Sequence, residues 1–515
     1  MNDKGRAWFL GLVAFLLLAP GAFYGLPSGK LVVGATRILQ GEVPYRDFWT
    51  MYAPGSCYLT AGLFSLLGRE LVVQALASCA LVAASSSVLY LLLRDAKVEV
   101  PIASSCALVL ALARWRTGIE LSSYDPAILL ALLAWRDVLA AKLVRAGLLL
   151  GAAAVFKHDL AAYAAVGAAL AIAVRRGNPM PLLASSLVVV LPAILLLAWG
   201  AGAEAWRDLV VFPATDFPVV RGEPYPHLVP RSQPLVAWVS HPSGVAEARD
   251  ALLAIGRFVA CFMPQVFFLA GLTVALQRGR KTPPALVLAL ALLPLFWMAA
   301  HVQQNTHVVT MAFLSSLVCA SAWGTHSLSR WALGIAAIFH AAGLLVAPAL
   351  ACVEMARGIP GASVLEVPGA ALVMVPEETH AALRPIAAFV RQNVPADEPI
   401  YVGLERHDAT VISCPILYYL CDRRPAVRYH ELHPGVTDRE DVQAEMLGWI
   451  EGRGARCAVL WRFGWPKERL DGIRDRSRRS VPGAGSDTLD VWLKERFELL
   501  ATYGEYDVRW IRAAR

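Results

Sequence analysis

The chain has 515 residues, of which 57% are hydrophobic and 17% charged, and its mean hydropathy is +0.52. A soluble protein of this length would not bury that much apolar surface, and the composition also excludes a disordered chain, a collagen and a small disulfide scaffold. Residues 1–350 hold 41 charged side chains and residues 351–515 hold 46. The first part is therefore predicted to lie in a membrane and the last to be soluble, and the net charge of +7 reflects membrane loops, with no nucleic-acid surface.

Eleven apolar runs come close to the length of about 20 residues that a spanning helix needs. They lie near 7–26, 71–93, 98–114, 125–141, 143–157, 159–174, 180–200, 251–276, 283–300, 308–323 and 331–350. A twelfth candidate, 53–68, is short and contains Pro54, Gly55 and Gly62. Whether it spans decides on which side every later loop lies.

The distribution of basic residues indicates that 53–68 does not span. With a cytoplasmic N-terminus and no span there, basic loops such as 278–281 face the cytoplasm, as the positive-inside rule requires, whereas a span would turn them outward. We therefore predict a helix lying in the membrane plane on the outer face. Its apolar stripe is expected to consist of Tyr58, Leu59, Leu63, Phe64 and Leu67. The first run could instead be a signal peptide, and residue 30 lies outside in either case.

Four segments are then expected on the outer face, namely 27–69, 114–125, 201–250 and everything after 351. We predict a transmembrane domain over 1–350, with outer loops 27–69 and 201–250, and an extracytoplasmic α/β domain over 351–515. Helices are expected near 378–393, 411–420, 438–451 and 487–498, with mostly parallel strands near 400–403, 427–430, 458–461 and 508–511. Arginines between 474 and 479, followed by Pro482, Gly483 and Gly485, are typical of a mobile basic loop.

Asp47 is a candidate for a catalytic base. It lies in the aromatic and proline-rich outer loop 41–55, directly after Arg46. It could be an ordinary surface carboxylate paired with Arg46. Alternatively, the aromatic side chains around it would remove water from the carboxylate and raise its pKa toward that of a useful base.

Polar residues also cluster where later spans begin or end on the same side. Asp125 starts the fourth span, with Glu120 shortly before it, and the residue that follows is Pro126. This order is typical of a helix N-cap, a role compatible with a catalytic one. Lys157 and His158 interrupt two apolar runs, and Lys157 could extend harmlessly to the interface or hold a phosphate.

Further candidate contacts lie in later outer segments. Arg221 and His227 belong to a proline-rich stretch and could contact phosphate. His301 and His307 flank a polar turn, but their separation of six positions differs from the four that places two ligands on one helix face. A divalent metal ion is conceivable by analogy, and no cofactor is required by the sequence.

The motifs in their order resemble the membrane-embedded GT-C glycosyltransferases of bacteria. They are Pro44-Tyr-Arg-Asp-Phe48, Pro54-Gly55, Leu66-Leu-Gly68, Asp125-Pro126 and Phe156-Lys157. Within that superfamily, the chain is similar to the family of aminoarabinose lipid A transferases and protein O-mannosyltransferases. The resemblance covers roughly the first 350 residues.

The resemblance implies an inverting transfer of a sugar from a polyprenyl-phosphate donor to a lipid, glycan or protein acceptor outside the cytoplasm, in the bacterial inner membrane. Asp47 would take the acceptor proton, and Lys157, Arg46 or Arg221 would hold the departing phosphate. Asp47, Asp125 and Lys157 are expected to converge on one cavity. Glu120, His158, His227, His301 and His307 are candidate substrate or metal contacts.

One departure keeps other functions open. Relatives usually carry an acidic residue at the start of the first outer loop, where this chain reads Tyr24-Gly-Leu-Pro-Ser-Gly-Lys30. Either Asp47 has taken over the base role, or the protein is a non-catalytic lipid-glycan binding or assembly protein. A secondary transporter is a further alternative, although the spans show no two-half symmetry and the ionisable residues lie at span ends.

Overall fold

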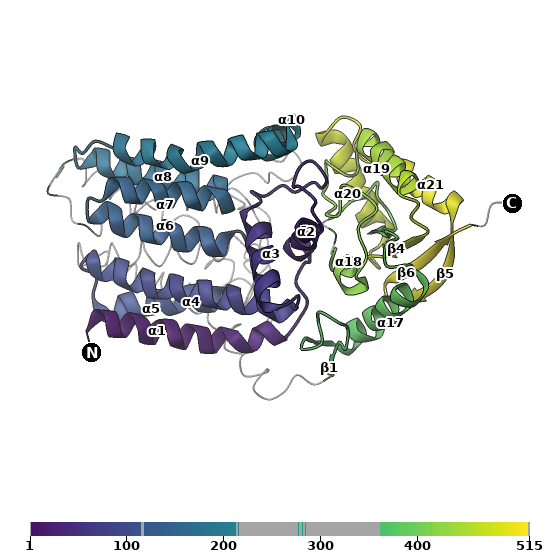
Figure 1. Ribbon diagram of the computed structural model, residues 1–515, viewed down its shortest axis with the longest axis horizontal. Coiled ribbons are helices and arrows are strands. Elements are labelled where there is room, and N and C mark those ends of the chain that lie inside the picture. Colours follow the sequence, from purple (N-terminus) through teal and green to yellow (C-terminus); the bar gives the residue numbers. More distant parts are fainter. Residues whose placement is uncertain are drawn as a thin grey trace, which may run out of the picture. The chain divides into compact units, whose positions relative to one another are not determined.

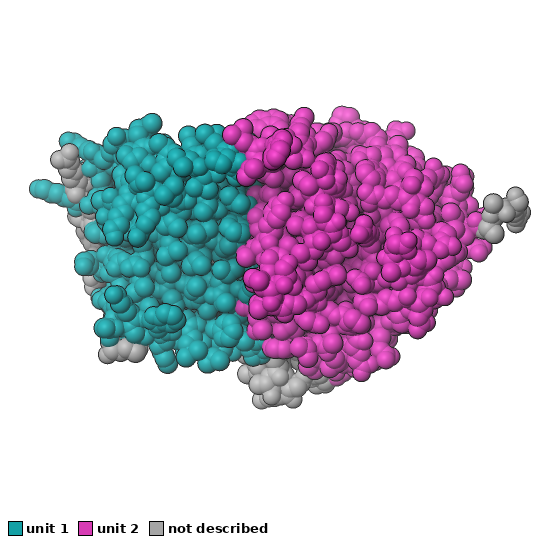
Figure 2. All heavy atoms as spheres, viewed as in Figure 1, with its two compact units in different colours: residues 1–21, 77–194, 222–358 teal, residues 22–76, 195–221, 359–515 magenta. Residues whose placement is uncertain are grey.

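A computed structural model of the chain describes residues 2–114, 118–212, 215, 277, 281, 284, 361–411, 413 and 415–512. The chain divides into two compact units, coloured separately in Figure 2. Unit 1 comprises Met1–Gly21, Ala77–Ile194 and Gly222–Gly358, and unit 2 comprises Ala22–Leu76, Leu195–Arg221 and Ile359–Arg515. The predicted domain boundary near 350 lies outside the described residues.

The described part of unit 1 is built from helices rich in apolar residues. They are α1 (Asp3–Leu18), most of α4 (Leu71–Asp95), α5 (Val100–Ala113), α6 (Tyr124–Leu139), α7 (Leu143–Phe156), α8 (His158–Val174) and most of α9 (Met180–Ala201). Each matches one of the first seven predicted spans. Helices α6, α7 and α8 lie side by side and share a core of alanine, leucine and aromatic side chains (Figure 1).

Three of the described helical segments are long and apolar enough to cross a membrane by themselves, namely Asp3–Phe23, Leu71–Asp95 and Met180–Ala201. The α5, α7 and α8 helices are apolar but shorter. The four spans predicted between 251 and 350 lie outside the described residues. The protein thus has a helical membrane part, and the predicted number of eleven spans stays a prediction.

Small residues allow α7 to pack closely against α9. A Cβ atom at Gly147 would lie 2.0 Å from Ser185 Oγ and 2.2 Å from the Leu182 carbonyl oxygen. One turn later, a Cβ atom at Gly151 would lie 2.6 Å from the Ser186 carbonyl oxygen. Close approach through glycines is the usual way in which membrane helices associate, because lipid offers no hydrophobic drive between them.

Unit 2 combines two segments from the first part of the sequence with the tail. The first contributes α2 (Lys30–Leu39) and α3 (Gly55–Leu67), and the second contributes α10 (Ala203–Trp206) with the π-helical turn η3 (Arg207–Val211). Side chains of α2 and α3 share a hydrophobic core with tail residues, including Ile416 and Val459. The α2 helix starts directly beside the tail backbone. Glycine at position 29 permits this close approach, since a Cβ atom there would lie 2.4 Å from the Ile416 nitrogen.

Helix α3 has 13 residues and is about 20 Å long, too short to cross the roughly 30 Å hydrocarbon core. The predicted apolar stripe is wrong in one member. Phe64 is 3% exposed and packs near Tyr419, because it faces the core of unit 2. Leu66, which is 83% exposed, lies with Tyr58 and Leu67 on the side of the helix that faces away from this core. Placement of this face in the membrane plane stays a prediction.

The tail contains a four-stranded mixed sheet in the order β3-β4-β6-β5. Strands β3 (Tyr401–Leu404) and β4 (Cys457–Trp461) are parallel, while β6 (Tyr506–Ile511) pairs antiparallel with β4 and with β5 (Phe497–Tyr503). The expectation of mostly parallel strands is therefore wrong. The predicted strand 427–430 is also wrong, since these residues leave the sheet after a single bridge between Ile400 and Pro425. A hairpin of β1 (Ala362–Val364) and β2 (Met374–Pro376) was not predicted.

The tail helices are α17 (Glu377–Asn393), α18 (Ile416–Cys421), α19 (Glu440–Gly452), α20 (Lys467–Ser480) and α21 (Thr488–Arg496). Four of them match predicted helices, although α18 starts later than expected. The predicted mobile basic loop is wrong, because the arginines from 474 to 479 belong to α20. Arg474 pairs with Asp471 one turn earlier, and Leu470 and Ser477 are buried, so charge pairing and one buried face stabilise this helix.

Candidate functional site

Asp47 lies in a tight turn of unit 2, with its carboxylate partly exposed. The carboxylate accepts hydrogen bonds from the Val43 N–H at 2.7 Å and from Arg46 Nη2 at 2.6 Å. The turn is closed by a bond from the Tyr45 N–H to the Phe48 carbonyl at 2.7 Å, and Tyr45 has a positive φ of 68°. The Asp47 side chain keeps 27% of its surface exposed, which leaves it accessible to a substrate.

Of the two alternatives for Asp47, the structure shows the carboxylate paired with Arg46, and its pKa is not raised. The hydrogen-bonded Arg46 guanidinium is the main cause that holds the pKa of this carboxyl below its usual value, and the Val43 N–H acts in the same direction. Partial burial of the carboxylate acts in the opposite direction but is outweighed. The neighbouring rings of Tyr45, Phe48 and Trp49 are themselves 0–2% exposed. Asp47 is therefore ionised at neutral pH and can accept a proton.

Arg37 of α2 is fully buried and stabilises this turn through hydrogen bonds. It donates to the Asp47 carbonyl at 2.7 Å and to the Val427 carbonyl at 3.1 Å, and it forms an ion pair with Glu42. Its guanidinium carbon also lies 5.1 Å from the centre of the Phe48 ring. Sequence reasoning missed this residue, since nothing in the local pattern distinguishes a buried arginine from an exposed one.

A second buried arginine, Arg428, holds the other side of the same turn. It donates to the Tyr45 carbonyl and to Asp208 Oδ2 at 3.0 Å, and Glu204 lies 3.4 Å away. Burial raises the pKa of Asp208 to about 6, although the Arg428 charge opposes the shift. The Asp47 turn is thus held by residues from all three segments of unit 2.

Lys30, the first residue of α2, pairs with a carboxylate from the tail. Its Nζ lies 2.9 Å from Oε1 of Glu431, which is 1% exposed and also bonded to His433. Burial opposes ionisation of Glu431, but Lys30 and His433 outweigh it and hold the pKa of this carboxyl below its usual value. The tail thus places a buried, ionised carboxylate beside Lys30.

Asp125 lies in unit 1 and is almost fully buried. Its carboxylate accepts from Ser78 Oγ at 2.8 Å and from the Ser122 N–H at 3.0 Å, and it lies 3.5 Å from the buried Arg114 guanidinium. The N-cap interpretation is wrong, because α6 begins at Tyr124 with Ser123 as its N-cap. Asp125 sits instead inside the first turn, and its partners suit a residue that positions neighbouring groups.

Lys157 lies at the break between α7 and α8 and is 7% exposed. Its ammonium is 2.8 Å from Asp159 Oδ2 and 5.2 Å from the centre of the Tyr124 ring. Since Tyr124 precedes Asp125, the structure brings Lys157 and Asp125 to the same end of unit 1. A phosphate held by Lys157 would compete with Asp159.

The remaining candidates are only partly described. Glu120 is half-buried, and its carbonyl accepts a hydrogen bond from Arg114. His158 begins α8 and is half-buried. Arg221, His227, His301 and His307 lie outside the described residues. Asp47 and Arg46 belong to unit 2, whereas Asp125 and Lys157 belong to unit 1, so their convergence stays a prediction.

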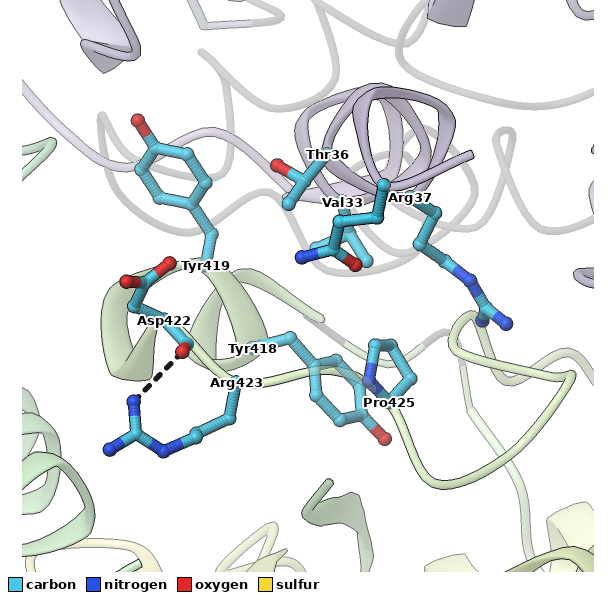
Figure 3. Close-up of a pocket in the computed structure, with 9 residues that line it drawn as sticks. Val33, Thr36, Arg37, Tyr418, Tyr419, Asp422, Arg423 and Pro425 are labelled. Atoms are coloured by element: carbon cyan, nitrogen blue, oxygen red, sulfur yellow. Dashed lines mark hydrogen bonds between the residues drawn. The ribbon is translucent and has the colours of Figure 1, made fainter. Parts of the chain in front are cut away.

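Two other features of unit 2 are not substrate sites. His407 bonds to Asp490 and to the Tyr401 hydroxyl, each at 2.6 Å, but its side chain is 0% exposed, so this network stabilises the tail core. The notch between α2 and α18 in Figure 3 holds only about 10 Å³, too little for a sugar. Among the described residues, no group of three or more His, Cys, Asp or Glu side chains is arranged to hold a metal ion.

Comparisons with known proteins give the fold its name. No protein-family model and no curated protein matches the chain. Crystal structures of ArnT from Cupriavidus metallidurans match it, in the apo state with a TM-score of 0.55 and bound to undecaprenyl phosphate with a TM-score of 0.51. Each is 11% identical and covers 99% of this chain and 98% of its own. The resemblance read from the motifs is confirmed at the level of the fold: this is a membrane protein with the ArnT-like GT-C fold and a C-terminal sheet domain.

Proposed function

We propose that the protein is an inverting glycosyltransferase that moves a sugar from a polyprenyl-phosphate donor to an acceptor on the outer face of the inner membrane. The likeness to ArnT over nearly the whole chain is the observation that carries this proposal, since one of the matching structures is bound to undecaprenyl phosphate. The accessible, ionised carboxylate of Asp47 supports it with a suitable base.

In the proposed reaction, the acceptor hydroxyl oxygen attacks the anomeric carbon while its proton passes to Asp47. The bond between that carbon and the phosphate oxygen breaks, and the lipid phosphate departs with the electron pair. This leaving group is already a stable anion and needs no general acid. Lys157, Arg46 and Arg221 would balance its negative charge, and Asp125 would position Arg114 and the start of α6.

The three chain segments that form unit 2 support an outward-facing site. Unit 2 gathers 22–76, 195–221 and 359–515, and each of these segments includes or adjoins a region predicted on the outer face from charge distribution alone. A common location would explain why chain segments far apart in sequence share one core. A cytoplasmic N-terminus follows from the same distribution.

Transfer of radiolabelled sugar from a panel of polyprenyl-phosphate donors tests the proposal in membranes that contain the full chain. Asp47→Asn is expected to lower the rate by about 10²- to 10⁴-fold, the usual contribution of a general base. Asp441→Asn is the matched control, because Asp441 also pairs with a nearby arginine in unit 2 but lies outside the turn. Its rate should equal that of the wild type.

The other outcomes decide between specific alternatives. Full activity of Asp47→Asn would move the base to Asp125 or Glu120. Absence of transfer from every donor by the wild type would contradict the enzyme and favour a non-catalytic lipid-glycan binding protein, in which Lys30 occupies the stretch that carries the early acid in relatives.

A further inference from the structure

Unit 1 contains a cavity of about 310 Å³ that no step of the proposed reaction uses. It is lined by Asp95, Leu133, Arg136, Asp137, Ala140, Lys142, Arg145 and Leu149. These residues come from the C-terminal end of α4, from α6, from the turn between α6 and α7, and from the start of α7. The volume falls in the range of small-molecule binding sites.

The lining changes from apolar to charged along the helices. Leu133 and Arg136 lie on one face of α6, since they are three positions apart, Ala140 follows at its C-terminal end, and Arg145 and Leu149 share a face of α7. From Leu133 to Ala140 the helix rises about 10 Å. The cavity is therefore apolar toward the middle of the helices and charged at the α6–α7 turn.

The charges in the cavity leave one positive charge in excess. Arg136 donates a hydrogen bond to Asp95 Oδ2 at 2.7 Å, and Arg145 forms a bidentate ion pair with the buried Asp137. The third cation, Lys142, is exposed, and no ion pair joins it to a described carboxylate. A ligand with a single negative charge and an apolar body would match both features of the cavity.

We propose that this cavity binds an anionic membrane phospholipid, with the phosphodiester beside Lys142 and an acyl chain along Leu133 and Leu149. The α6–α7 turn joins two predicted spans, so it lies where lipid headgroups are found, and basic pockets between membrane helices bind such headgroups. On the predicted orientation this is the cytoplasmic leaflet, whereas the transfer reaction is proposed on the outer face. The lipid would hold the ends of α4, α6 and α7 together.

Binding is measured on the full chain in detergent by native mass spectrometry, with phosphatidylglycerol and phosphatidylcholine as probes. Phosphatidylglycerol is expected to bind more tightly than phosphatidylcholine. Lys142→Gln should weaken the binding of phosphatidylglycerol about fivefold, the factor expected for one basic group near an anionic lipid surface. Lys97→Gln is the matched control. Like Lys142, Lys97 is an exposed lysine in a turn, but its turn follows α4 and its side chain does not line the cavity.

A second variant tests the shape of the cavity without changing its charge. Ala140→Phe would place a ring in the cavity from an exposed position, so the fold should survive while phosphatidylglycerol binding is lost. Equal binding of the two lipids, equal effects of Lys142→Gln and Lys97→Gln, or unchanged binding by Ala140→Phe would each overturn the proposal. Competition by millimolar inorganic phosphate alone would also overturn it, by showing a simple anion site. None of these readouts depends on glycosyl transfer.

Discussion

The buried guanidinium of Arg37, near the start of the chain, donates a hydrogen bond of 3.1 Å to the carbonyl of Val427 in the tail. The same group holds the Asp47 carbonyl and Glu42, so one side chain joins the first loop to the tail. Arg37→Met should destabilise the protein by about 3–5 kcal/mol, because it leaves Glu42 and two carbonyls without their partner. Denaturant unfolding of the full chain in detergent, followed by tryptophan fluorescence, measures this loss.

Arg46→Met is the control for that experiment. Arg46 is 53% exposed and its pair with Asp47 is at the surface, so its loss should destabilise the protein far less than the loss of Arg37. Similar destabilisation by both variants would mean that Arg37 is not the residue that joins the two segments.

Arg46 should nevertheless control the pH dependence of transfer. A base must be deprotonated to act, and Arg46 holds the pKa of Asp47 below its usual value, so the wild type should stay active well into the acid range. Arg46→Gln removes the bond that lowers the pKa, and the acid limb of kcat/KM should move to higher pH. Rates measured across the acid range with a saturating acceptor test this shift. An unchanged acid limb, with only KM altered, would assign Arg46 to phosphate binding alone.

Burial of Asp208 should make stability depend on pH. The pKa of this carboxyl rises from 3.8 to about 6 on folding. The stabilisation that the protonated carboxyl gives the folded state is therefore complete below pH 3.8 and is lost as the pH rises through 6. Asp208→Asn cannot ionise and should avoid this loss. Relative to the wild type, the variant should gain on the order of 2 kcal/mol between about pH 4 and pH 7.

Melting temperatures of both proteins across that range check the prediction. Asp441→Asn serves as a reference, because Asp441 is exposed and its pKa is lowered, so removal of its charge should not produce a gain at higher pH. A difference between Asp208→Asn and wild type that does not change with pH would contradict the assignment.

Gly147→Ala should disturb the packing of α7 on α9. The new Cβ would lie 2.0 Å from Ser185 Oγ and 2.2 Å from the Leu182 carbonyl oxygen, so backbone atoms must move. We expect a loss of about 1–3 kcal/mol, seen as a lower melting temperature and a lower yield of folded protein.

Gly62→Ala is the matched substitution in α3, where the added Cβ meets no atom within 4 Å. It should raise stability by up to about 1 kcal/mol, because alanine favours the helix more than glycine does. Equal effects of the two substitutions would show that the α7–α9 contact is not as close as the geometry indicates.

The sequence by itself predicted the described helices of the membrane part and most elements of the tail. Apolar runs predicted α1 and α4 to α9, because helix formation in a membrane depends on the local density of apolar residues. The motifs, among them the one around Asp47, led to a resemblance that the comparisons confirm at the level of the fold.

Only the tertiary structure decided how distant segments meet. The turn around Asp47 depends on Arg428 and Asp208, and the carboxylate beside Lys30 comes from Glu431, 401 positions later. The order of the strands in the sheet likewise became clear only in the structure. Apolar periodicity is a local property that each segment carries alone, whereas burial of a charge depends on which segments pack around it, and that packing exists only in the folded chain.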